Sequence, residues 1–78
     1  MALREIVARN LRRLRRSKGL SQEELADRAG INRNYVGMLE REENSATVDM
    51  LEKLADVLNV DPIEFFKRPL REAKDAKR

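Results

Sequence analysis

The fold is decided by residues 22–41, QEELADRAGINRNYVGMLER. This stretch predicts two short helices, 22–29 and 33–42, joined by a tight turn. Gly30 marks the end of the first helix, because glycine adopts the left-handed backbone conformation without steric cost. The stretch therefore predicts a pair of helices connected by only a few residues.

Both of these helices have capping residues at their start. Ser21 precedes the first helix, and Glu24, three residues later, completes a capping box. Asn32 is a suitable N-cap for the second helix. Ile31 and Val36 flank this cap at the spacing of a hydrophobic staple, which fixes how the chain enters the helix.

The second helix has two faces of different character. Val36 and Leu39 form its buried stripe. At 100° per residue, a group of polar and small residues shares one arc of roughly 140° on the opposite side. They are Arg33, Asn34, Gly37, Met38 and Arg41. A helix anchored on one side can present this arc to a partner.

The spacing Q-x-x-L-A-x-x-A-G-I-x-x-x-x-V-x-x-L-E resembles the helix-turn-helix of the lambda-repressor-like, Cro-type (XRE) DNA-binding family. The later TVDMLEKLADVLNVDP resembles the fourth helix of that family, so the resemblance covers residues 3–66. It implies an all-α, compact five-helix lambda-repressor-like domain whose helix-turn-helix is formed by helices 2 and 3. Within the family, NRNYVGMLER is most similar to controllers of restriction–modification operons.

Apolar residues at helical spacing predict the remaining helices. The first extends over about residues 2–18. The fourth begins after Thr47, and a short fifth begins at Asp61-Pro62 with a capping box and ends at Pro69. Residues 69–78 form a charged tail that we expect to be weakly ordered, so the domain covers residues 1–68.

Composition limits the class of protein. Seventy-eight residues allow one domain, and a chain of this size buries only about 60% of its unfolded surface. The net charge is +3, and the basic residues concentrate in residues 1–20 and 61–78. A polyanionic partner would be attracted to these ends, although a solvated helix face explains most single arginines equally well.

Several kinds of site are not expected. The chain has no cysteine and no histidine, which removes the common metal ligands and the usual general base. Its carboxylates do not accompany a glycine-rich phosphate loop or a nucleophile motif. We therefore expect no enzyme activity, metal, cofactor or small-molecule ligand. No apolar run is long enough to span a membrane, so a cytoplasmic protein is expected.

The resemblance and the chemistry of the side chains assign contacts to double-stranded DNA. Arginine pairs with guanine and asparagine with adenine in the major groove, while free N–H groups at a helix start favour phosphate. Base contacts are assigned to Arg33, Asn34, Gly37 and Met38. Phosphate contacts are assigned to Gln22, Asn32, Tyr35, Arg41, Asn44 and Ser45.

Several of these assignments have alternatives. Gln22 is a solvent-exposed side chain in its alternative, and Asn34 makes no base contact in its own. Arg33 contacts phosphate or makes no contact in its alternatives. Independently, Met38 is either a partner for a thymine methyl group or a surface residue without a role. Gly37 is expected to face outward, where it either permits close approach of DNA or has no role. Together the assignments describe a sequence-specific transcriptional regulator. The alternative is an antitoxin-like protein-interaction module, because residues 40–60 have an acidic balance that suits a basic partner.

A homodimer on a palindromic operator is expected, because one recognition helix contacts only a few base pairs. Ile63 and Phe66, together with Val60, are the expected interface, since the short fifth helix cannot bury all of its large apolar residues. Phe65 is expected to face inward.

An internal ion pair is expected between Arg15 and Glu40. Glu40 lies at the edge of the buried stripe, about 40° from Val36, where an unpaired carboxylate is costly. Arg15 follows Leu14 in the first helix, and some relatives pair an arginine and a glutamate at the matching places. The pair would fix the third helix relative to the first.

Overall fold

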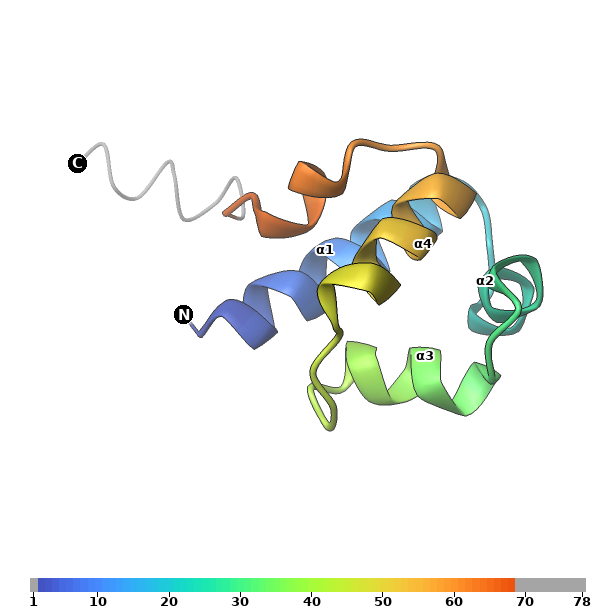
Figure 1. Ribbon diagram of the computed structural model, residues 1–78, viewed down its shortest axis with the longest axis horizontal. Coiled ribbons are helices and arrows are strands. Elements are labelled where there is room, and N and C mark those ends of the chain that lie inside the picture. Colours follow the sequence, from blue (N-terminus) through green and yellow to red (C-terminus); the bar gives the residue numbers. More distant parts are fainter. Residues whose placement is uncertain (1, 69–78) are drawn as a thin grey trace.

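The computed structural model describes residues 2–68, in which all regular structure is helical (Figure 1). The order of elements is α1 Leu3–Ser17, α2 Gln22–Ala29, α3 Arg33–Glu40, α4 Val48–Leu58, and the 3-10 helix η1 Pro62–Phe66. The first four expected α-helices are therefore present, with α3 ending two residues earlier than predicted. The expected weak order of residues 69–78 lies outside the described residues.

The prediction of a fifth α-helix ending at Pro69 is wrong. The chain makes five residues of 3-10 helix, and Lys67 is already extended at φ −75° and ψ 136°. Asn10 of α1 donates hydrogen bonds to the carbonyl oxygens of Phe65 at 2.9 Å and Lys67 at 2.7 Å. Those carbonyls therefore bond to a side chain of α1 instead of to a following helical turn. The proline at position 69 also disfavours helical conformation at the residue before it.

Side chains cap the starts of α2, α3 and α4 as the sequence predicts. Ser21 and Glu24 form both halves of the capping box. Asn32 accepts a hydrogen bond from the backbone N–H of Asn34, and Thr47 accepts one from that of Met50. Each cap satisfies an N–H group that has no partner within its helix.

The four α-helices end in the same way. In each, a residue in the left-handed conformation directs its own N–H and the following N–H back to the carbonyls of the last turn. These residues are Gly19, Gly30, Glu42 and Asn59. Glycine and asparagine suit this conformation, whereas Glu42, with φ 63°, has a Cβ that disfavours it.

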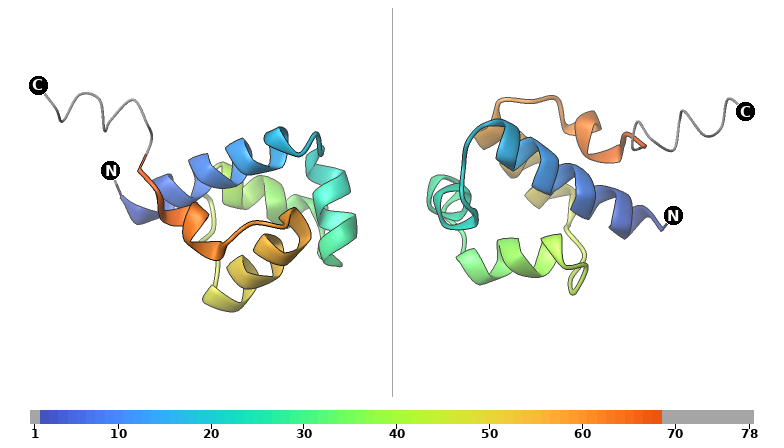
Figure 2. Two further views of the ribbon diagram at one scale, coloured as in Figure 1. Left: turned by 90° about the horizontal axis from the view of Figure 1, so that it is seen from above. Right: turned by 180° about the vertical axis from the view of Figure 1, so that it is seen from behind.

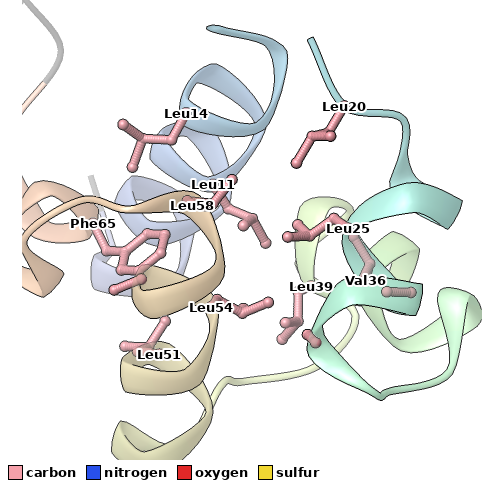
Figure 3. Packing of buried hydrophobic residues seen from close by; sticks show 13 residues of the cluster. Leu11, Leu14, Leu20, Leu25, Val36, Leu39, Leu51, Leu54, Leu58 and Phe65 are labelled. Atoms are coloured by element: carbon pink, nitrogen blue, oxygen red, sulfur yellow. The ribbon is translucent and has the colours of Figure 1, made fainter. Parts of the chain in front are cut away.

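The helices surround one apolar core to which every element contributes (Figure 3). Its largest fully buried side chains are Phe65, Leu11, Leu25, Leu54, Leu58 and Val36. Figures 1 and 2 show α2 at one end of the molecule, where it packs against both α3 and α4. Phe65 is buried as expected, and this anchors η1 against α1. The core therefore holds α2 and α3 as a rigid pair with the outer side of α3 left uncovered.

Candidate nucleic-acid interface

The start of α2 and the outer side of α3 together line a polar hollow of about 410 Å³. Its lining residues are Arg15, Ser21, Gln22, Glu23, Arg33, Asn34, Gly37 and Arg41. Four of the five residues on the predicted outer arc of α3 therefore line one hollow together with Gln22, a predicted phosphate contact. Met38 is half-buried and does not line the hollow.

Arg33 and Asn34 lie exposed on the first turn of α3. Arg33 forms an ion pair with Glu23 at 3.4 Å, and about two thirds of each side chain remains accessible to solvent. An ion pair this exposed holds its partners only weakly, so the guanidinium is free to exchange Glu23 for another acceptor. Asn32, by contrast, uses its carbonyl oxygen to cap α3.

Gly37 lies on the outer arc of α3 as predicted, but it is buried there. Arg41 extends back over it, so that a Cβ built on Gly37 would lie 2.8 Å from Arg41 Nη1. The same Cβ would lie 3.6 Å from Gln22 Oε1. Gly37 is therefore on the outer arc of the helix, but two long polar side chains cover it. Helical periodicity alone could not reveal this cover.

Gln22 is tied to the end of α3. Its Nε2 donates to Glu40 Oε1 at 3.0 Å, and its side chain is half-buried. The backbone N–H groups of Gln22 and Glu23 have no acceptor within residues 2–68. These N–H groups and the positive end of the α2 dipole favour an anion at this point.

Glu40 is the centre of a buried hydrogen-bonded cluster. Arg15 donates to it twice, from Nε to Oε2 at 2.7 Å and from Nη2 to Oε1 at 3.0 Å. Arg12 Nη2 donates to the Glu40 backbone carbonyl at 2.7 Å, and Arg15 Nη1 donates to that of Leu20 at 2.8 Å. The ion pair expected between Arg15 and Glu40 is thus present and joins α1 to α3, and the hydrogen bond from Gln22 joins α2 to the same carboxylate.

The charges in this cluster are stabilised by their partners. Burial raises the pKa of Glu40, but hydrogen bonds from Arg15 and Gln22 and the charge of Arg12 outweigh it, so the pKa lies below its ordinary value. The hydrogen bond to Glu40 raises the pKa of Arg15 despite burial. Both groups are therefore charged in the folded protein at neutral pH.

Arg41 pairs with Glu43 just beyond α3. Its Nε donates to Oε2 at 2.8 Å and its Nη2 to Oε1 at 3.2 Å. This hydrogen bonding raises the pKa of Arg41 and lowers that of Glu43. The predicted phosphate contacts in the next loop are engaged locally. Asn44 accepts a hydrogen bond from the backbone N–H of Ser45, whose hydroxyl accepts one from Arg4.

Of the remaining predicted contacts, Tyr35 is half-buried and packs against the core cluster. Ile63 and Phe66 are exposed by 61% and 39%, whereas Val60 is half-buried and packs against the core. Val60 therefore offers less surface to a second copy than the other two predicted interface residues. The hydrogen bonds of buried Asn10 were not predicted from the sequence. Its position within the apolar stripe of α1 was a signal that it would be buried.

Two further features of residues 2–68 bear on the type of protein. They contain no group of three histidine, cysteine, aspartate or glutamate residues that could hold a metal ion. None of their helices has the length and apolar character needed to cross a bilayer.

Residues 11–65 match the family model described as Helix-turn-helix. The chain belongs to this XRE-type helix-turn-helix family. It is 44% identical over 64 residues to the uncharacterized HTH-type transcriptional regulator y4dJ of Sinorhizobium fredii, covering 82% of this chain and 83% of the relative. Members of this helix-turn-helix family are DNA-binding transcriptional regulators. The polar hollow lies mainly on α2 and α3, the two helices joined by the tight turn.

Two solved structures resemble this helix-turn-helix protein closely. The hypothetical transcription factor NHTF from Neisseria has a TM-score of 0.85 and 37% identity, covering 94% of this chain and 84% of that one. The restriction-modification controller protein C.AhdI from Aeromonas hydrophila has a TM-score of 0.78 and 41% identity, covering 81% of this chain and 96% of that one.

Proposed function

We propose that this protein is a sequence-specific regulator of transcription that inserts α3 into the major groove of an operator. The observation that carries the proposal is the exposed first turn of α3 beside the unpaired N–H groups of α2. Arg33 and Asn34 are then placed to contact base edges, and Gln22 to contact a phosphate. The relatives are described as a transcriptional regulator and a hypothetical transcription factor, so the proposed function includes no catalytic activity.

The buried cluster supports this arrangement by fixing its geometry. Glu40, the last residue of α3, bonds to Arg15 of α1 and to Gln22 of α2. The proposed phosphate contact and the proposed base-contacting helix are therefore held to each other by one carboxylate. Asn32, Tyr35, Arg41, Asn44 and Ser45 complete the proposed phosphate contacts, and Gly37 and Met38 the base contacts.

Substitution of Arg33 tests the assignment of base contacts. Arg33→Ala should weaken binding to the preferred sequence by about 1–3 kcal/mol and relax the preference at one base pair. Gln22→Ala should weaken binding to all sequences more evenly, because a phosphate contact is independent of sequence. Binding is measured on duplexes that carry each single-base change.

Lys53→Ala is the matched control for these variants, since it removes one exposed positive charge from α4. It should leave the base preferences unchanged. If Arg33→Ala retained every base preference of the unmodified protein, Arg33 would not contact a base.

We also propose that two copies of the protein form a dimer through Ile63 and Phe66, and that this dimer binds a two-fold symmetric operator. Two-fold pairing would place the α3 helices about 34 Å apart on one side of the DNA. Phe66 borders an apolar groove of about 340 Å³ that also includes Leu3, Val7, Val48 and Leu51. Exposed apolar surface of this kind is typical of an interface.

Sedimentation at micromolar concentration tests the proposed dimer. The unmodified protein should sediment as a dimer and Ile63→Lys as a monomer, because a charge at the interface would be buried without a partner. Glu52→Lys places the same charge at an exposed site on α4 and should remain dimeric. A monomeric protein that binds a palindrome without cooperativity would exclude this arrangement.

A protein-interaction module on the same fold is the second candidate. The acidic side chains of the connector after α3 and of α4 are exposed, which suits a basic partner. They are Glu42, Glu43, Asp49, Glu52 and Asp56. Salt dependence separates the candidates, because log K for DNA falls with log salt concentration by about 0.9 for each phosphate neutralised. If DNA binding did not weaken steeply with rising salt concentration, the result would favour the second candidate.

A further inference from the structure

We infer that Arg41 contacts a guanine in the major groove, and that Gly37 and Glu43 are the residues that position it. This inference rests on the proposed DNA-binding function and changes the roles assigned to two of its residues. Arg41 becomes a base contact in place of a phosphate contact. Gly37 acts through Arg41 and not through its own contact with DNA.

The first observation is the path of the Arg41 side chain. Arg41 is the C-cap of α3, yet its guanidinium lies over Gly37, one helical turn back toward the start of the helix. There it shares the polar hollow with Arg33 and Asn34. The backbone position of Arg41 would suit a phosphate beside the groove, whereas the position of its guanidinium suits the groove itself.

The second observation is the space that Gly37 provides. A Cβ at this position would lie 2.8 Å from Arg41 Nη1 and 3.6 Å from Cζ, so any larger residue requires the guanidinium to move. Gly37 does not have a positive φ, and its backbone conformation therefore does not require glycine. The contact that excludes a side chain at Gly37 is the one with Arg41.

The third observation is the way in which Glu43 binds Arg41. Its carboxylate accepts hydrogen bonds from Nε and Nη2, at 2.8 Å and 3.2 Å, along one edge of the planar guanidinium. Within residues 2–68, Nη1 donates no hydrogen bond, and Nη2 has one acceptor for its two hydrogens. Two donors on one edge match the O6 and N7 acceptors of guanine. Glu43 thus holds the plane of the group and leaves the edge that guanine needs.

The exposure of the pair agrees with this role. The Arg41 side chain is 56% exposed and that of Glu43 is 53% exposed. Arg41 is therefore accessible to DNA, and in this structure two hydrogen bonds to Glu43 orient its guanidinium. Arg33 has a single, longer ion pair with Glu23 at 3.4 Å, so Arg41 is the better oriented of the two exposed arginines in the hollow.

The test uses the full chain and a panel of duplexes that carry each single-base change in the sequence that the unmodified protein selects from random DNA. Arg41→Lys should lose the preference for one G·C pair by about tenfold or more, because lysine cannot form the two-point contact. Its salt dependence should be retained, because the positive charge is kept.

Gly37→Ala should lose the same preference without a lower thermal unfolding midpoint. Alanine favours helix more than glycine does, and the clash involves only the far end of a flexible side chain. Glu43→Gln should also reduce the preference, since an amide cannot accept both hydrogen bonds. Glu42→Gln is its control, because it removes an equal charge one residue away and should leave the preference intact.

Three results would overturn the inference. One is a Lys variant that keeps all base preferences, which would show that Arg41 contacts phosphate. Another is a Glu43→Gln variant that binds every sequence more tightly without losing discrimination, which would show that Glu43 only withholds Arg41 from DNA. The third is a Gly37→Ala variant with unchanged preferences. If the unmodified protein selected no sequence from random DNA, the proposed function itself would fail instead.

Discussion

Two arginine–glutamate pairs lie at the end of α3, alike in geometry and different in surroundings. Arg15 and Glu40 approach to 2.7 Å, and Arg41 and Glu43 to 2.8 Å. The side chains of the first pair are 9% and 2% exposed, whereas those of the second are 56% and 53% exposed. Burial, and not the length of the contact, therefore separates a pair that holds helices together from one that is available to a ligand.

The largest expected difference between the pairs is in stability. Glu40→Ala should lower the free energy of unfolding by about 3–5 kcal/mol, because it leaves Arg15 buried without its partner. Glu43→Ala should leave the unfolding midpoint nearly unchanged, since both members of the Arg41–Glu43 pair are exposed to solvent. Urea denaturation measures both variants. A loss below about 1 kcal/mol for Glu40→Ala would mean that the two pairs are equivalent.

Lowering the pH should reveal the same difference in stability between the two pairs, with a smaller effect. The pKa of Glu40 is below its ordinary value, so between these two values the unfolded chain binds more protons than the folded one. The stability that Glu40 contributes is therefore complete above about pH 5 and is lost as the pH falls through its lowered pKa.

Denaturation at a series of pH values between neutral and strongly acidic checks this effect. Glu40→Gln should flatten the loss of stability on acidification more than Glu43→Gln does. Equal flattening by both variants would contradict the contrast between the pairs.

The smallest expected effect concerns Glu42, which lies between the two glutamates. Its φ of 63° disfavours a side chain, so Glu42→Gly should raise the free energy of unfolding by about 0.5 kcal/mol, part of the gain being offset by the entropy of glycine in the unfolded chain. Asn59→Gly, at φ 57°, should change it less because asparagine tolerates this conformation. Thermal denaturation of both variants checks the order.

The buried pair could be anticipated from sequence and the exposed one could not. Glu40 lies at the edge of an apolar stripe whose spacing fixes what is buried, and a buried carboxylate needs a partner. The path of Arg41 over Gly37 depends on the rotamer of a long, half-exposed side chain. Periodicity contains no information about that rotamer, and so the burial of Gly37 beneath Arg41 could not be predicted.

The helix starts could likewise be predicted, because capping depends on residues within one turn of each other. The 3-10 form of η1 could not. It depends on Asn10, whose side chain bonds to the carbonyls of Phe65 and Lys67, more than fifty residues away in the sequence. The hydrogen bond from Gln22 to Glu40 was missed for the same reason, since it joins two helices.

Selection of bound duplexes from random DNA by the full chain tests the central claim most directly. We expect one enriched motif with two-fold symmetry, whose half-sites are centred about one helical turn, or 34 Å, apart. Enrichment of no sequence would contradict the claim that α3 and the start of α2 form a sequence-specific DNA-binding surface. Enrichment of a single unpaired half-site would contradict its action as a dimer.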